Sequence, residues 1–323
     1  MSDDLTLKQS EKMHQKEGFS RYRGPKLKGV RTELTWEEKE FPEPLMHIPQ
    51  PPKHLYVIGN TEALTEGLAV VGARKATPYG KACAEKFAGI AAARGIVIIS
   101  GGARGCDARA HRAALDSGGK TVVILGGGCD EIYPAENFGL FQDVIEGGGA
   151  IVSEQPWEFP PLRHTFRARN RLIAGLSRAT LIVEAGLPSG TFSTADEALA
   201  ASKEVLVVPG SIISPTSRGA NRLLYQGATP VVDTESFEDI LSGLFGCLKQ
   251  EEYIQGGHDV DDDLLCMVYA MPMNQEEILT ALKTSSKMSK TSSLVEVTVR
   301  LATLQQEGKI TRFPDGRFGP ARV

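Results

Sequence analysis

The chain of 323 residues is long enough for about two domains, and its composition, 41% hydrophobic and 24% charged, is that of a globular protein. A net charge of −4 excludes a basic surface over the whole molecule, so a site for a polyanion has to be a local patch. The five scattered cysteines exclude the usual zinc spacings and a disulfide framework, and no apolar run reaches the roughly 18 residues of a membrane span. We therefore expect a cytoplasmic protein without membrane contact.

The N-terminal region differs in character from the rest of the chain. Residues 1–40 are charged and lack apolar periodicity, which predicts a polar, flexible or loosely helical arm. Residues 41–57 hold five prolines, so we expect an extended lead-in to the next domain rather than a helix.

Short apolar runs then alternate with helical patterns. The runs are rich in Val and Ile and apolar on both faces, as buried parallel strands are. They start at residues 68, 96, 121, 150, 179, 204 and 229. Between the first two lies a helix candidate over residues 78–95, with Pro78 near its start and Gly95 at its end. This alternation predicts an α/β, Rossmann-like, doubly wound domain over residues 41–247 with a mostly parallel sheet.

The C-terminal part comes after a polar stretch. Residues 248–262 have the composition of a linker. Residues 263–323 contain three helical patterns and then alternating residues around an Asp-Gly turn, which favours a hairpin. Three helices and a hairpin predict a small winged-helix domain.

A glycine-rich loop is expected at the end of the second apolar run. It spans Ser100, Gly101, Gly102, Ala103, Arg104 and Gly105, but it lacks the full dinucleotide fingerprint, and no Walker lysine follows its last glycine. Its backbone N–H groups and the following helix N-terminus can hold an anion. A tight turn that needs glycine for steric reasons alone is the other interpretation. Arg74 and Lys75 follow the preceding strand, at the sheet edge where α/β proteins bind ligands.

An arginine cluster gives the most specific indication. Five arginines lie between Glu158 and Glu184 without an intervening acid, and Phe166 and Asn170 lie among them: Arg163, Phe166, Arg167, Arg169, Asn170, Arg171 and Arg178. Guanidinium groups bind phosphates and a ring stacks on a base, so the cluster favours single-stranded nucleic acid. In the alternative interpretation, Phe166 fills the core and some arginines pair with Glu154 or Glu184.

Two further helix starts lie at strand ends. Ser189, Gly190 and Thr191 open a helix and form another candidate anion site. Arg218 starts a later helix and is a candidate for backbone contact. The sequence shows no metal triad, no Cys–His pair and no paired carboxylates, and His111 and His164 lack an evident partner. We expect no catalytic residue, no metal and no cofactor.

Four motifs together resemble the DNA-processing protein A (DprA/Smf) family: V-G-A-R-K-A-T-P-Y-G, S-G-G-A-R-G-C-D-A-R-A-H, F-R-A-R-N-R-L-I-A-G-L-S and V-P-G-S-I with S-R-G-A-N-R-L-L. The resemblance implies an extended Rossmann-like domain that binds single-stranded DNA without sequence preference and forms a homodimer. It also implies protection of incoming DNA and its delivery to the recombinase RecA during natural transformation or recombination. The implied DNA contacts are Arg74, residues 100–105, Arg163, Phe166, residues 169–171 and, more weakly, Ser189 and Gly190.

The chain departs from the family pattern at three places. Position 73 is Ala where the family commonly has Ser, and about 40 polar residues precede the match where many members have a helical domain. The winged-helix region matches the family only in pattern.

Two other functions stay open. Rossmann-like phosphoribohydrolases share this sheet, but the position of their catalytic glutamate holds Thr194 here, and Glu197 lies three residues later. In the second alternative, the winged helix binds duplex DNA and the α/β core only dimerises.

Overall fold

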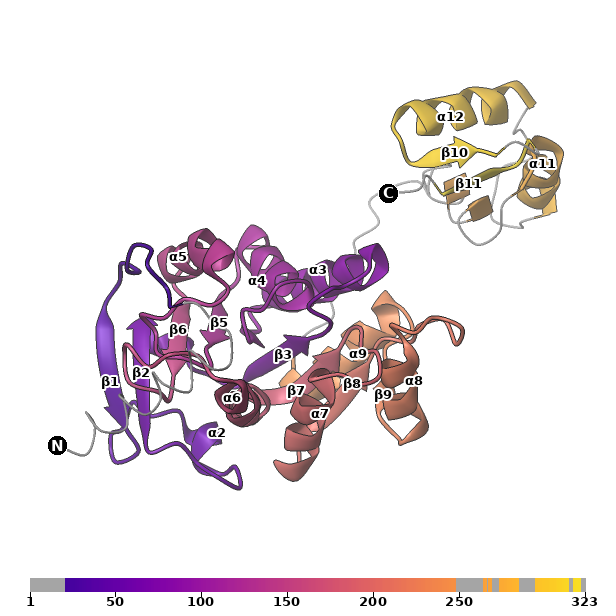
Figure 1. Ribbon diagram of the computed structural model, residues 1–323. Coiled ribbons are helices and arrows are strands. Elements are labelled where there is room, and N and C mark those ends of the chain that lie inside the picture. The colour runs from indigo at the N-terminus through magenta and orange to yellow at the C-terminus, as the bar shows by residue number, and fades with distance from the viewer. Residues whose placement is uncertain are drawn as a thin grey trace. The chain divides into compact units, whose positions relative to one another are not determined.

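The computed structural model describes residues 21–247, 264–265, 267–268, 273–284, 294–313 and 316–320. The chain divides into two compact units, Met1–Lys249 and Gln250–Val323 (Figure 1). The first twenty residues of the predicted arm and the predicted linker over 248–262 lie outside the described residues.

The first unit is built on one nine-stranded sheet with the order β1-β2-β6-β5-β4-β3-β7-β8-β9. Strands β3 to β9 are parallel to one another, whereas β2 runs antiparallel to both β1 and β6. The strands are β1 (Arg31–Thr35), β2 (His54–Gly59), β3 (Gly67–Val71), β4 (Ile98–Ser100), β5 (Thr121–Ile124), β6 (Ala150–Ser153), β7 (Ser177–Ile182), β8 (Glu204–Val207) and β9 (Thr229–Pro230). The prediction of an α/β fold with a mostly parallel sheet is confirmed.

Helices cover both faces of this sheet, as Figure 1 shows for α3, α4 and α5 on one side and α6 and α7 on the other. The first layer consists of α3 (Pro78–Ala93), α4 (Cys106–Asp116), α5 (Phe138–Glu146) and α9 (Thr234–Phe245). The second consists of α2 (Glu43–Met46), α6 (Arg163–Leu176), α7 (Thr191–Ala200) and α8 (Arg218–Tyr225). Alternate residues of β3 pack into opposite layers, Leu68 and Val70 into one and Ala69 and Val71 into the other. This is why the strand is apolar on both faces.

The N-terminal part of this unit differs from the prediction. The range 1–40 was expected to be a polar arm, yet β1 lies within it and pairs along its whole length with β2. Leu27 and Leu34 are 4% and 3% exposed, so they anchor the segment in the core. Two apolar residues at this separation create no periodicity, and the sequence pattern therefore could not reveal the strand.

The second unit has a core of its own, which includes Leu264, Ile278, Leu301 and Ile310. Its elements are α11 (Gln275–Thr284), α12 (Leu294–Gln306) and an antiparallel pair, β10 (Ile310–Arg312) with β11 (Phe318–Pro320). The predicted hairpin is thus confirmed. Across the described parts of both units, every helix falls short of the length and apolar character that crossing a membrane requires.

Candidate functional site

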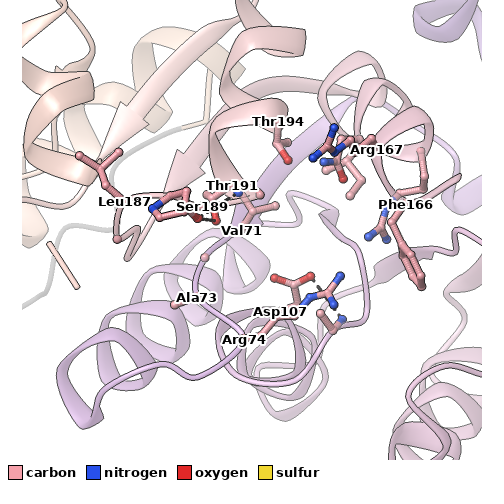
Figure 2. Close-up of a pocket in the computed structure, with 18 of the residues that line it drawn as sticks. Val71, Ala73, Arg74, Asp107, Phe166, Arg167, Leu187, Ser189, Thr191 and Thr194 are labelled. Atoms are coloured by element: carbon pink, nitrogen blue, oxygen red, sulfur yellow. Dashed lines mark hydrogen bonds between the residues drawn. The ribbon is translucent and has the colours of Figure 1, made fainter. Parts of the chain in front are cut away.

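The strand order changes direction at β3. Strands β4, β5 and β6 follow on one side of it, and β7, β8 and β9 lie on the other. In such sheets, the loops at the carboxyl ends of the strands diverge at the reversal and leave a crevice for ligands. A cavity of about 960 Å³ lies there, lined by the loops after β3, β4 and β7 and by α6 (Figure 2). We call it the first cavity.

One face of α6 forms a wall of the first cavity. Arg163, Phe166, Arg167 and Asn170 follow the spacing i, i+3, i+4, i+7, which places them on one side of a helix, and all four line the cavity. The helix starts directly at Arg163, because the Leu162 N–H donates to Thr165 Oγ1 at 3.1 Å. The two arginines are exposed, so their charges face solvent at the cavity mouth.

Phe166 lies in a small cluster of rings and charge. The guanidinium carbon of Arg74 is 5.4 Å from the centre of the Phe166 ring. The Tyr133 ring centre is also 5.4 Å away, with its plane tilted by 55°. A β-carbon at Gly126 would come within 2.8 Å of the Phe166 ring, so this close packing requires glycine there. The cluster provides a flat apolar surface with a cation beside it.

Arg169 has a different role from its neighbours on α6. Its guanidinium is buried, and Nη1 donates to the carbonyl oxygens of Gly101, at 2.7 Å, and of Ile124. These carbonyls belong to the segments that follow β4 and end β5, so Arg169 fixes the two strand ends relative to α6. Burial lowers the pKa of Arg169 to about 10.

A buried carboxylate lies near this guanidinium. Burial raises the pKa of Asp107, and the positive charge of Arg169 opposes the rise. Asp107 Oδ2 accepts a hydrogen bond from the Ala103 N–H at 3.3 Å, which holds the loop after β4 against the start of α4.

The charge of the first cavity is positive. Among its described lining residues, the ionisable side chains besides Tyr133 are four arginines and one acid: Arg74, Arg163, Arg167, Arg169 and Asp107. Figure 2 shows Ser189 and Thr191, at the start of α7, across the cavity from Phe166 and Arg167. A helix N-terminus adds positive partial charge. The arrangement suits a polyanion with flat, apolar groups.

The sequence comparison agrees with this geometry. The family model described as DNA recombination-mediator protein A matches residues 32–244, which include every segment that lines the first cavity. The chain belongs to this family.

Curated relatives and solved structures show how far the similarity extends. Protein Smf from Escherichia coli is 39% identical over 230 residues, which are 67% of this chain and 62% of that protein. A putative DNA processing protein DprA from Mycobacterium tuberculosis is 42% identical over 191 residues, 59% of this chain and 49% of the relative. The matches thus span less than two thirds of these two relatives.

Two solved structures of the family superpose on this chain. DprA from Streptococcus pneumoniae has 35% identity and a TM-score of 0.61, covering 66% of this chain and 74% of that one. DprA from Helicobacter pylori has 32% identity and a TM-score of 0.61, covering 69% and 99%. The Helicobacter protein is described for its single-stranded DNA binding mode.

The structure brings most of the predicted site residues of this family member together. Those that line the first cavity are Arg74, Ala103, Arg163, Phe166, Arg167, Arg169, Asn170, Ser189, Gly190 and Thr191. Tyr133 and Asp107 also line it and were not predicted. The signal that could have found Tyr133 is its position shortly after Gly126, Gly127 and Gly128, which directly follow a predicted strand.

Other predicted residues lie outside the lining. Ser100 is buried, and its hydroxyl donates to the Val70 carbonyl at 2.6 Å. Gly102 and Gly105 have φ of +66° and +80°, so the turn needs them for its backbone. Gly101, which accepts from Arg169, and the exposed Lys75 also lie outside the lining.

Three arginines of the predicted sites form ion pairs. Arg171 pairs with Glu154, which confirms the alternative interpretation for this residue. Arg178 pairs with Glu66 and lies away from the first cavity. Arg104 pairs with Glu136 at the surface.

The structure places three residues that the sequence analysis discussed in connection with catalysis: His111, Thr194 and Glu197. His111 is buried, and its Nδ1 lies 2.7 Å from Thr121 Oγ1. Burial lowers the pKa of His111 to about 3, so the ring is neutral. Thr194 lines the first cavity, and Glu197 is not among the lining residues. Among the residues that the structure describes, no group of three or more His, Cys, Asp or Glu could hold a metal ion.

Proposed function

We propose that this protein binds single-stranded DNA without sequence preference in the first cavity. One observation carries the proposal: Phe166 lies beside Arg74 and Tyr133, in a cavity whose mouth presents Arg163 and Arg167. A ring can stack on any base, and guanidinium groups bind the phosphates between bases. Such contacts tolerate every sequence, since none of them reads a base edge. The similarity to the Helicobacter pylori protein supports the same ligand.

The wider role follows from the family. We propose that the bound strand is protected and delivered to the recombinase RecA during natural transformation or recombination, and that the chain acts as a homodimer in the cytoplasm. The order of two helices and a hairpin in the second unit supports the predicted winged-helix domain. Its helix candidate at residues 264–271 is only partly covered by the described residues.

The proposed role is binding rather than catalysis. Thr194 stands in the first cavity where a phosphoribohydrolase would have its catalytic glutamate, and a hydroxyl cannot replace a carboxylate as nucleophile or base in that chemistry. Incubation with nucleoside monophosphates is expected to release no free base. Release of base would support the enzymatic alternative instead.

Fluorescence anisotropy with a labelled thymidine oligomer tests the proposed site. The test variant is Arg163→Glu with Arg167→Glu, since both side chains are exposed and line the first cavity. The control is Lys28→Glu with Lys120→Glu, the same change of charge at exposed positions near the amino end of the parallel strands. A further variant, Phe166→Ala, removes the ring.

Binding is expected to weaken in the arginine variant but not in the lysine control. Each lost phosphate contact lowers the slope of log K against log salt by about 0.7, so the arginine variant should lose about 1.4. The loss of one stacked base in Phe166→Ala costs about 1–3 kcal/mol. Equal binding by the wild type and both site variants would exclude the first cavity. Removal of residues 261–323 then tests the alternative, since only that alternative predicts complete loss of binding.

A further inference from the structure

A second cavity of about 500 Å³ lies next to the first. Its walls are residues 21–25, residues 132–136, Arg104 and Phe138. Tyr133 lines both cavities, and Arg104 belongs to the same loop after β4 that contributes Ala103 to the first. The two cavities therefore meet at a tyrosine whose ring also packs near Phe166.

The N-terminal wall of the second cavity is held in place by a buried carboxylate. Glu131 is 5% exposed and accepts from Arg21 Nε at 2.9 Å and from the Tyr22 N–H at 3.1 Å. The Tyr22 hydroxyl donates to the Pro25 carbonyl at 3.0 Å. A β-carbon at Gly24 would lie 2.3 Å from this hydroxyl, so the ring can fold over the segment only because position 24 is glycine. The wall is thus formed before any ligand arrives.

The second cavity offers the same two kinds of group as the first. The rings of Tyr22 and Phe138 are stacked, with centres 6.3 Å apart and planes 19° apart. Arg23 is exposed and forms no ion pair with any residue that the structure describes. An unpaired nucleotide stacks its base on such a ring, and a neighbouring cation binds its phosphate.

Arg104 provides a second cation. Its side chain is 62% exposed and pairs with Glu136, which is 53% exposed. Exposed pairs of this kind contribute about 0–1 kcal/mol, so a phosphate can take the place of the carboxylate at little cost.

We propose that the second cavity is a further subsite for the same single strand, which leaves the first cavity past Tyr133. Tyr22 and Phe138 provide the surface for a base, and Arg23 and Arg104 bind its phosphates. This inference rests on the proposed function, because the first cavity has to hold the strand that continues into the second. In this proposal, the segment at residues 21–25 increases the number of nucleotides that one protein molecule binds.

A length series of labelled thymidine oligomers tests the subsite with the full chain. The variant is Arg23→Glu, and the matched control is Lys28→Glu, an exposed cation of the same segment that does not line the cavity. One phosphate contact changes affinity about fivefold at roughly 0.1 M salt. We expect Arg23→Glu to bind long oligomers about fivefold more weakly and short oligomers as the wild type does. The affinity should reach its plateau at a shorter length in this variant.

Photocrosslinking locates the strand directly. Oligomers with one 5-bromouracil at successive positions are irradiated in complex with the wild-type protein, and the crosslinked peptides are identified by mass spectrometry. Crosslinks to Tyr22 from one end of the oligomer and to Phe166 from more central positions would support the subsite.

Each contrary result points to a different error. Equal binding of every length by Arg23→Glu and the wild type, with no crosslink to residues 21–25, would overturn the subsite and leave the proposed function intact. Absence of binding of every oligomer by the wild type would overturn both.

Discussion

Arg169 is the position at which a structural and a DNA-contacting role can be separated. It lies on the same helix as Arg163, yet its guanidinium is buried and bonded to the carbonyls of Gly101 and Ile124. Arg169→Met keeps most of the side-chain volume and removes these bonds. We expect this variant to lose stability, whereas Arg163→Met should lose affinity for DNA and keep its stability.

The magnitude depends on the groups that the substitution leaves without a partner. A buried polar group without a partner costs about 1–3 kcal/mol, and two carbonyls are affected. The nearby Asp107 also loses the positive charge that opposes the rise of its pKa. Together these effects should lower the free energy of unfolding by about 3–5 kcal/mol, the usual cost of removing one member of a buried charged group. Arg163→Met, at an exposed site, should change it by less than about 0.5 kcal/mol.

Urea unfolding followed by circular dichroism measures both variants at two pH values. Burial favours the protonated form of Asp107 in the folded protein, so its contribution is most favourable at low pH and declines as the pH rises past the ordinary aspartate value. The deficit of Arg169→Met should therefore be larger at pH 8 than at pH 5. Equal stability of Arg169→Met and the wild type would refute the structural role of Arg169, and so would a lower stability of Arg163→Met than of Arg169→Met.

Three further predictions concern buried groups. The pKa of His111 is about 3 in the folded protein and 6.5 in the unfolded chain, so protonation of the unfolded chain should lower the free energy of unfolding by about 2 kcal/mol at pH 5. Urea unfolding of His111→Asn should lack this dependence of stability on pH. Gly101→Ala places a β-carbon 2.3 Å from Arg169 Nη1, so it should lower the melting temperature and weaken DNA binding, as calorimetry and anisotropy would show. Burial raises the pKa of the Cys106 thiol to about 12, so iodoacetamide at pH 8 should label Cys106 only after unfolding, by mass spectrometry.

The parallel sheet could be predicted because buried strands are apolar on both faces. Each predicted run from residue 68 onward corresponds to one of β3 to β9, since short Val- and Ile-rich runs at this spacing are typical of buried parallel strands. The strand order could not be predicted, because it depends on which strand edges meet. The glycine and arginine positions still predicted where the cavity lies, because these residues follow parallel strands, whose carboxyl ends lie on one edge of the sheet.

The roles of the individual arginines were harder to predict. Whether a side chain of α6 faces the cavity or the core depends on where the helix starts, and a shift of two residues exchanges Arg167 for Arg169. Arg171 pairs with Glu154 across a loop, which the sequence offered only as an alternative. Tyr22 and Arg23 were missed because they lie in a stretch without periodicity, held by a single carboxylate from far along the chain.

The reversal of strand order at β3 makes the binding site depend on complete folding of the parallel sheet. Segments near residues 72, 103, 133, 166 and 190 meet in the first cavity, so the binding site exists only when the whole parallel sheet has formed. A ligand that binds only this state stabilises it by mass action, by about 2.7 kcal/mol at a concentration one hundred times its dissociation constant. Single-stranded DNA would then act as a folding ligand, and the half-life of the protein against proteolysis should increase when such DNA is abundant.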